Sequence, residues 1–199
     1  MISGLREDAI TEQAGALGEF VVRKAGMRDI GPILALINGY AAKGVMLPRT
    51  ELEVSEDIRD FSVIMTAGRL VGCGALHFYT PSIAEIRSLA VAEQAKTLGI
   101  GRRLIEALVK ESSDYSLDAV FAFTYVPGFF RKMGFQEVER GELPLKAWKD
   151  CVRCPKFQCC DEIAVLRVLR PEYTRNAQQY LQREDSLLVQ LPVLRQLQY

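Results

Sequence analysis

A short apolar strand that leads through a glycine-containing turn into an amphipathic helix constrains the fold of this chain more than any other feature. The strand is predicted at residues 83–92, and the turn contains Gly99 and Gly101. The following helix carries apolar residues at positions 100, 104, 105 and 108, a spacing that places them on one face toward a core. Because glycine has no Cβ, the backbone of this turn can approach a ligand closely.

The start of this helix predicts a site for phosphate. The N–H groups of a first helical turn have no partner inside the helix, and the helix dipole places partial positive charge there. Arg102 and Arg103 add cationic donors. The loop is not a Walker A loop, because the chain contains no Gly-Lys-Ser/Thr, and Leu104 replaces the third glycine of a dinucleotide fingerprint. A different phosphate-bearing cofactor is therefore expected.

The segment Lys-Thr-Leu-Gly-Ile-Gly at residues 96–101 resembles the coenzyme A loop of the GNAT acetyltransferases, Gln/Arg-x-x-Gly-x-Gly/Ala, with Lys96 in the first position. Residues 68–74 and 129–135 resemble further GNAT elements in the expected order, and the resemblance covers residues 20–169. It implies an α/β GNAT fold, a mixed and mostly antiparallel sheet of about six to seven strands flanked by helices, with acetyl-CoA as cosubstrate. The implied cofactor-binding residues are Leu89, Ala90, Val91, Lys96, Thr97, Leu98, Gly99, Ile100, Gly101, Arg102 and Arg103.

Shorter segments resemble the acetyltransferase domain of N-acetylglutamate synthases, and most of all the short bacterial type without an amino-acid-kinase domain. This resemblance implies acetylation of the α-amino group of L-glutamate, the first step of arginine biosynthesis. Another amino acid such as glutamine, a protein amine, or a non-catalytic role as an acyl-CoA sensor remain alternatives. The segments are residues 46–49, 60–61, 71–77, 85–91, 142–144 and 146–157.

Acetyl transfer to an amine requires a group that removes the amine proton, and a carboxylate can do so. Glu85 is the candidate base, because it stands eleven residues before Lys96, as in GNAT enzymes that use a glutamate. Residues i and i+2 share a face of a strand, so Glu85 can instead pair with Arg87.

The thioester carbonyl must also be polarised during the reaction. The resemblance implies that the backbone N–H of Leu89 or Ala90 does this, in the manner of an oxyanion hole. Many GNAT enzymes place a tyrosine acid at the position that Phe130 occupies here, and Tyr125 is only nearby in sequence. No acid is therefore assigned.

An amino-acid acceptor carries at least one carboxylate, which arginine recognises well. Arg49 is the leading candidate ligand, with Leu47 beside it through its backbone. The resemblance adds His77 and Ser88, and Arg87 either reaches the acceptor or pairs with Glu85. A protein amine needs no partner for an α-carboxylate, so Arg49 separates these two classes of acceptor.

Four cysteines, Cys151, Cys154, Cys159 and Cys160, lie within ten residues. They suggest zinc ligation, with His77 as the single histidine, but one tight cluster is cramped compared with two separated cysteine pairs. Buried thiols or a redox-sensitive loop are the alternative. We therefore assign no metal.

The formal net charge of zero gives no support for binding to nucleic acid or to an anionic membrane. No apolar run approaches the roughly 20 residues of a membrane span, and no signal peptide is visible, so a cytoplasmic protein is expected. We expect an N-terminal arm at 1–18, one domain at 19–170 and a helical tail at 171–199, which packs on its own domain or docks in a homodimer. Strands are expected at 20–24, 61–66, 70–79, 83–92, 119–124, 135–139 and 162–169, and helices at 29–40, 51–60, 99–112 and 128–133.

Overall fold

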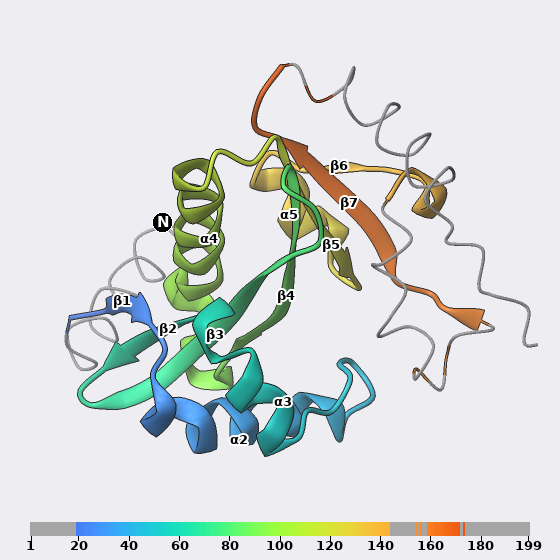
Figure 1. The fold of residues 1–199 in the computed structure, drawn as a ribbon. Coiled ribbons are helices and arrows are strands. Elements are labelled where there is room, and N and C mark those ends of the chain that lie inside the picture. The colour runs from blue at the N-terminus through green and yellow to red at the C-terminus, as the bar shows by residue number, and fades with distance from the viewer. Residues whose placement is uncertain (1–18, 144–153, 155, 157–158, 172, 174–199) are drawn as a thin grey trace, which may run out of the picture.

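The computed structural model describes residues 19–143, 154, 156, 159–171 and 173 (Figure 1). The expected N-terminal arm, Cys151 and nearly all of the expected C-terminal tail lie outside these residues. A seven-stranded sheet organises the described part of the chain, in the order β1-β2-β3-β4-β5-β7-β6. Its strands are β1 (Val21–Lys24), β2 (Phe61–Thr66), β3 (Arg69–Phe78), β4 (Ile83–Val91), β5 (Ala119–Thr124), β6 (Gln136–Glu137) and β7 (Ile163–Val168).

The sheet is mixed and mostly antiparallel, which confirms the expected architecture. Only β4 and β5 run parallel, and α4 (Ile100–Asp114) provides the connection between them, as a parallel pair requires. The other helices are α2 (Ile30–Ala41), α3 (Glu51–Glu56) and α5 (Pro127–Lys132). Short 3₁₀ segments are η1 (Met27–Asp29), η2 (Ile58–Asp60), η3 (Glu93–Leu98) and η4 (Arg140–Glu142).

The helix expected at residues 51–60 is interrupted. Thr50 caps α3 by accepting from the N–H of Glu53, and the Glu53 side chain accepts in return from the N–H of Thr50. Asp57 then leaves helical geometry, with φ −94° and ψ 9°, and η2 follows as a separate turn. The break matters for the site, because the half-buried carboxylates of Asp57 and Asp60 at the end of α3 pair with Arg87 and His77.

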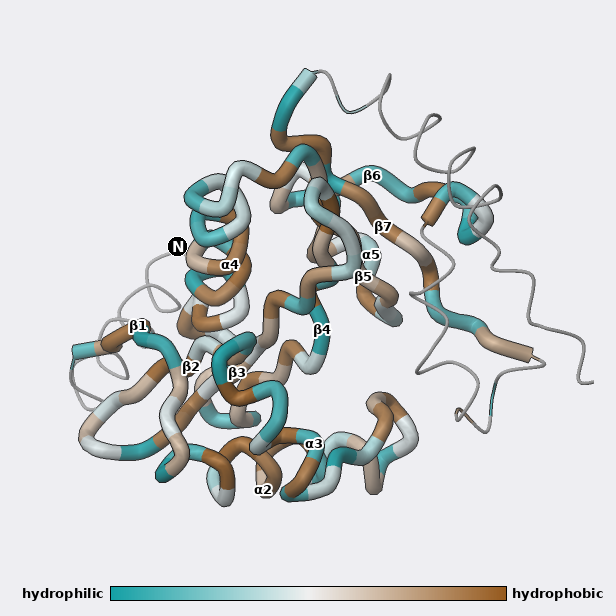
Figure 2. The backbone as a smooth tube through the Cα atoms, viewed as in Figure 1, coloured by the Kyte–Doolittle hydropathy of each residue, from teal (hydrophilic) through white to brown (hydrophobic). Residues whose placement is uncertain are grey.

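Helices cover both faces of the sheet, as Figure 1 shows. Helices α4 and α5 pack on one face, while α2 and α3 pack on the other face beneath the N-terminal strands. Hydrophobic residues concentrate on these strands and on the helix surfaces that meet them (Figure 2). The wholly buried hydrophobic residues of α4 are Ile100, Leu104, Ile105 and Leu108, the four that the sequence pattern placed toward the core.

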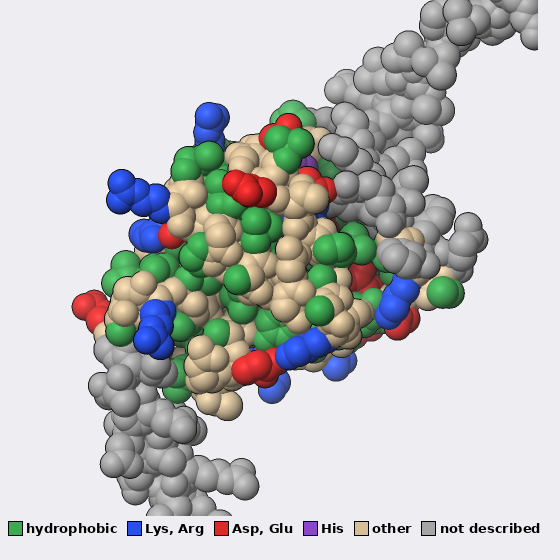
Figure 3. All heavy atoms as spheres, turned by 90° about the horizontal axis from the view of Figure 1, so that it is seen from below, with side chains coloured by type: hydrophobic (Ala, Val, Ile, Leu, Met, Phe, Trp, Pro, Cys, Tyr) green, Lys and Arg blue, Asp and Glu red, His purple; other side chains and the backbone are tan. Residues whose placement is uncertain are grey.

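Charged side chains do not gather into one patch on the face of the molecule that Figure 3 shows. On the face shown in Figure 3, the basic and acidic side chains lie scattered among hydrophobic ones, as expected for zero net charge. None of the helices in the described residues has the length and apolar character needed to cross a membrane.

The two parallel strands separate soon after they begin. Strand β4 pairs with β5 only from Ile83 to Glu85, opposite Ala119 to Phe121. Further along β4, the pairing with β3 shifts between Cys73 and Ala75, and Ser88 adopts a φ of +54°, a β-bulge that bends the strand. The second half of β4 therefore lies away from β5.

Gly72 of β3 keeps α4 close to the sheet. A Cβ at this position would lie 2.8 Å from Ile100 Cγ2 and 3.0 Å from Leu104 Cδ1, so α4 would have to shift. We predict that Gly72→Ala lowers the free energy of unfolding by about 1–3 kcal/mol, the usual cost of overpacking. Urea denaturation of both proteins measures this difference.

Gly39→Ala provides the matched control for this prediction. Gly39 is exposed on the outer side of α2, with nothing within 4 Å of its Cβ position. Since alanine is the better helix former, this variant should be as stable as the wild type or up to about 1 kcal/mol more stable. An equal loss of stability in both variants would contradict the packing argument.

Candidate active site

A cavity of about 680 Å³ lies where β4 separates from β5. Residues 85–91 of β4 form one wall, and residues 123–126 with α5 form the opposite wall. The start of α4 borders it, as does the loop between α2 and α3, through residues 45–47 and Arg49. The cavity thus brings together the two regions that the sequence singled out, the glycine turn and the Leu-Pro-Arg segment.

The glycine turn has the geometry expected at the start of a helix that binds an anion. Gly99 precedes α4 with φ +73°, a left-handed conformation that glycine adopts without steric cost. Gly101 allows a close approach, because a Cβ there would lie 3.3 Å from Phe129 of α5. The N–H groups of the first turn of α4 have no acceptor within the helix and border the cavity.

The side chains of this loop divide into two groups. Lys96, Gly99, Gly101 and Arg102 line the cavity, whereas Thr97, Leu98, Ile100 and Arg103 are not among its lining residues. The structure therefore does not place these four expected cofactor contacts at the cavity wall.

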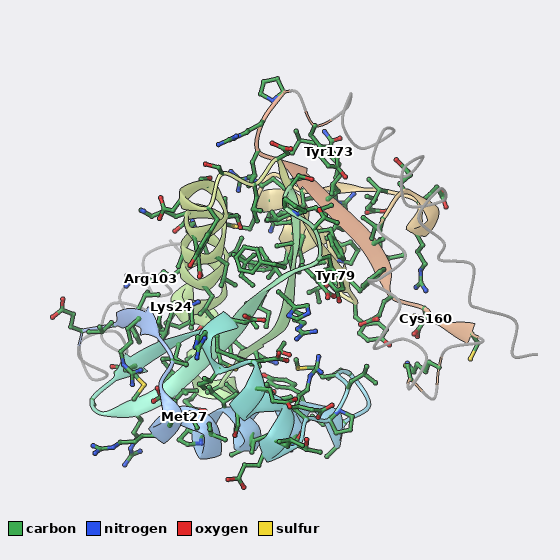
Figure 4. The ribbon with its side chains drawn as sticks, viewed as in Figure 1. Lys24, Met27, Tyr79, Arg103, Cys160 and Tyr173 are labelled. Carbon is green, nitrogen blue, oxygen red and sulfur yellow. The ribbon has the colours of Figure 1, made fainter. Side chains whose placement is uncertain are left out.

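The side chains of Ile100 and Arg103 lie among other residues and do not line the cavity. Ile100 is wholly buried in the core against Ile64 and Val71. The Arg103 guanidinium lies 5.4 Å from the centre of the Phe20 ring, and Figure 4 shows Arg103 well apart from Tyr79 and Cys160. Arg102 borders the cavity and pairs with Glu106 at 2.7 Å.

Lys96 is held at the edge of the cavity by two partners. Its Nζ lies 3.0 Å from Glu93 Oε1 and 5.1 Å from the centre of the Tyr40 ring. The hydrogen bond to Glu93, followed by that to Tyr40, raises the pKa of Lys96 above its ordinary value. Lys96 thus stays cationic beside the glycine turn.

The β4 wall presents main chain to the cavity. Leu89, Ala90 and Val91 all line it, and in this stretch β4 has no pairing with β5. Ser88 and Leu89 both fall opposite Gly74 of β3 at the bulge, so the backbone direction changes here. Backbone N–H and C=O groups on this edge can bind an extended ligand as an added strand would.

Glu85 stands at the point where the two strands part. It is 8% exposed, lines the cavity, and its Oε2 accepts a 2.9 Å hydrogen bond from the Tyr79 hydroxyl. Motif reasoning missed Tyr79. The hairpin register that pairs His77 with Glu85 would have indicated it, because Tyr79 lies two residues farther toward the turn.

Arg87 turns toward the broken end of α3. Its Nη2 donates a 2.7 Å hydrogen bond to Asp57 Oδ2, and its side chain is only 10% exposed. This ion pair holds Arg87 in the β4 wall of the cavity. The next residue, Ser88, also lines the cavity. Both residues are therefore placed where the sequence expected substrate contacts.

The loop between α2 and α3, which carries Arg49, is attached to α2 through Asn38. Its side chain donates to the Arg49 carbonyl and accepts from the Arg49 N–H, both at 2.9 Å. Leu47 and Arg49, the expected acceptor ligands, both line the cavity. These two hydrogen bonds fix the backbone of Arg49 relative to α2.

His77 differs from the expectation that it contacts substrate. It is absent from the described residues that line the cavity, and its Nδ1 lies 2.7 Å from Asp60 Oδ2. Asp57, Asp60 and His77 can offer three ligand atoms within 4.8 Å of one another. Since Asp57 already pairs with Arg87 and Asp60 with His77, we assign this group to structure.

A polar wall opposite β4 is a further feature that the motifs did not reveal. Its residues come from segments far apart in the chain, and among them the Arg140 Nη2 donates to Cys160 Sγ at 3.1 Å. Burial raises the pKa of Glu162 above its ordinary value. Figure 4 shows Cys160 on the chain that leads into β7. The wall consists of Tyr125, Arg140, Cys154, Cys160 and Glu162.

The cysteines show no metal cluster in the part of the chain that the structure describes. Cys154, Cys159 and Cys160 are free thiols, and no group of three ligand atoms includes any of them. Cys151 lies outside the described residues. Cys73 is buried beneath the β4 bulge, and burial raises its pKa to about 12.

Comparison with known proteins agrees with this geometry. Residues 57–137 match the model of the acetyltransferase (GNAT) domain. An uncharacterized N-acetyltransferase of Chlorobaculum tepidum is 44% identical over 148 residues, which cover 74% of this chain and 96% of that protein. An amino-acid acetyltransferase of Mycobacterium tuberculosis is 34% identical over 122 residues, covering 60% of this chain and 70% of that protein.

The fold has close neighbours among solved structures as well. N-acetylglutamate synthase from Neisseria gonorrhoeae, complexed with coenzyme A and N-acetyl-glutamate, superposes with a TM-score of 0.70 at 28% identity. The match covers 77% of this chain and 36% of that larger chain. The strand order, the separated β4 and β5, and these relatives lead to one conclusion: the chain belongs to the GNAT family of acetyltransferases.

Proposed function

We propose that this protein transfers the acetyl group of acetyl-CoA to the α-amino group of L-glutamate, the opening step of arginine biosynthesis. The observation that carries the proposal is the cavity, in which the helix start of α4, the unpaired edge of β4, Glu85 and Arg49 meet. The relatives named amino-acid acetyltransferase support an amino-acid acceptor. The synthase solved with coenzyme A and N-acetyl-glutamate supports glutamate.

The donor binds along the glycine turn and β4. The N–H groups at the start of α4 receive the pyrophosphate, and Lys96 and Arg102 add positive charge. The pantetheine arm extends along the β4 edge at Leu89 and Val91. This path brings the thioester to the bulge, where the Leu89 N–H polarises its carbonyl.

The acceptor binds on the side of the cavity that Arg49 and Arg87 border. Arg49 pairs with a carboxylate of the amino acid, with the Leu47 backbone and Ser88 beside it. Its α-amino group then lies near Glu85. A protein amine would have no carboxylate to pair with Arg49, which is why a free amino acid is the better acceptor.

The reaction proceeds by direct transfer between the two substrates. Glu85 accepts the proton from the amine, whose nitrogen forms a bond to the thioester carbonyl carbon. The C–S bond then breaks, and coenzyme A leaves as a thiolate. Phe130 cannot protonate this thiolate, so departure relies on the low basicity of a thiolate and on solvent.

Arg49→Ala tests the acceptor assignment. With saturating acetyl-CoA and a panel of free amino acids, the wild type should show the highest kcat/KM with glutamate. The variant should raise the KM for glutamate about tenfold or more, because a charge-assisted pair is lost, while the KM for acetyl-CoA stays unchanged. Thiol release from coenzyme A measures both constants.

Arg59→Ala is the matched control, because Arg59 is exposed on η2 and does not line the cavity. It should leave both constants unchanged. Preference for glutamine or another amino acid would replace the acceptor but retain the mechanism. No turnover with any free amino acid would reject the acceptor class.

Lys96→Ala tests the donor site. We expect the KM for acetyl-CoA to rise about three- to tenfold with kcat little changed, because one cationic contact to phosphate is lost. Lys110→Ala on the exposed far part of α4 removes the same charge away from the cavity and should have no effect. An equal rise in both variants would mean that only net charge matters.

Glu85→Gln tests the base. The substitution keeps the size of the side chain but removes its ability to accept a proton, so kcat should fall about a hundredfold or more. The KM for acetyl-CoA should stay near the wild-type value. Unchanged kcat would show that another group, or water alone, deprotonates the amine.

A further inference from the structure

Tyr79 is a hydrogen-bond partner of the proposed base. Its hydroxyl donates a 2.9 Å hydrogen bond to Glu85 Oε2. Tyr79 directly follows β3, and Glu85 lies on β4, the other strand of the hairpin. Glu85 is buried, so its carboxylate depends on protein partners more than a surface carboxylate does.

Ring contacts hold the Tyr79 hydroxyl in place. The His77 ring meets the Tyr79 ring edge-to-face, with centroids 5.1 Å apart and an angle of 83°. Phe121 of β5 lies 5.7 Å away on a tilted approach. His77 is itself fixed by Asp60 at 2.7 Å, so support extends from η2 through His77 and Tyr79 to Glu85.

We propose that Tyr79 is a positioning residue for Glu85, and that His77 acts in the reaction through Tyr79 instead of contacting the substrate. The proposal rests on the proposed role of Glu85 as the base. The Tyr79 hydroxyl holds Oε2 of Glu85 in place, and this orients the carboxylate within the cavity. A donated hydrogen bond also favours the ionised carboxylate, the form that can accept a proton.

The other ionisable groups that pair across the strands with Glu85 or line the same cavity keep their side chains when the hydroxyl is removed. They include His77 on β3, Arg87 on β4, Arg49 on the loop before α3, and Tyr125, Arg140 and Glu162. Tyr79→Phe keeps the aromatic ring and its contacts with His77 and Phe121. The variant therefore isolates the hydrogen bond.

The test is the pH dependence of kcat, measured with the amino acid that gives the highest turnover. Activity that requires ionised Glu85 is present at high pH and is lost as the pH falls. Without the hydroxyl, we expect the midpoint of this acidic limb to move about one pH unit upward, while the KM for acetyl-CoA and the melting temperature stay near wild type. A uniform loss of kcat with an unmoved midpoint would overturn the proposal.

Tyr115→Phe is the matched control. Tyr115 is 63% exposed and meets the Phe78 ring edge-to-face outside the cavity, so its hydroxyl should not affect the acidic limb. Tyr79→Leu repeats the measurement in case the phenylalanine variant does not fold. A limb that moves equally in the Tyr115 variant would also reject the assignment.

A second readout separates this proposal from the proposed reaction. The ¹³C-labelled Glu85 carboxyl, assigned through Glu85→Gln, can be titrated by NMR without any substrate. An upward shift of its midpoint in Tyr79→Phe supports the positioning role even if no amino acid is turned over. Coincident titration curves would refute the role even if glutamate proves to be the acceptor.

Discussion

The separation of β4 from β5 after Glu85 is the constraint on which the rest of the molecule depends. A sheet normally satisfies its backbone groups by pairing, and an open interior edge would leave them without partners. Here the bulge at Ser88 bends β4, while Gly72 and Gly74 let α4 and Leu89 pack closely on the other side. The result is a cavity whose wall is an unpaired strand edge inside a stable sheet.

The two ends of this cavity are built by different physical means. Backbone groups dominate the proposed donor end, where Gly99 and Gly101 have no side chains to block a close approach. Ion pairs and hydrogen bonds dominate the proposed acceptor end, where Asn38 bonds the Arg49 backbone and Asp57 pairs with Arg87. Both ends depend on short-range geometry, so neither requires a net charge on the protein.

The sequence could reveal those parts of the site that lie within one continuous segment. The strand, the turn and the helix around Gly99 follow from local periodicity and from glycine, and the core face of α4 follows from its spacing. The Tyr79–Glu85 contact and the approach of Arg140 to Cys160 require knowledge of how distant segments pair. The direction of His77 toward Asp60 also depends on the break in the helix at Asp57. The sequence did not predict this break, because it indicated one helix over residues 51–60.

Because the proposed donor site consists largely of main chain, the two ends of the cavity respond differently to mutation during evolution. Substitution alters side chains and leaves peptide groups in place, so the β4 edge would keep the proposed donor contacts under most mutations. The acceptor end, by contrast, consists of side chains on separate elements, including Arg49 and the wall that contains Glu162. New acceptor preferences can therefore arise by single replacements there, without rebuilding the half of the site that supplies the acyl group.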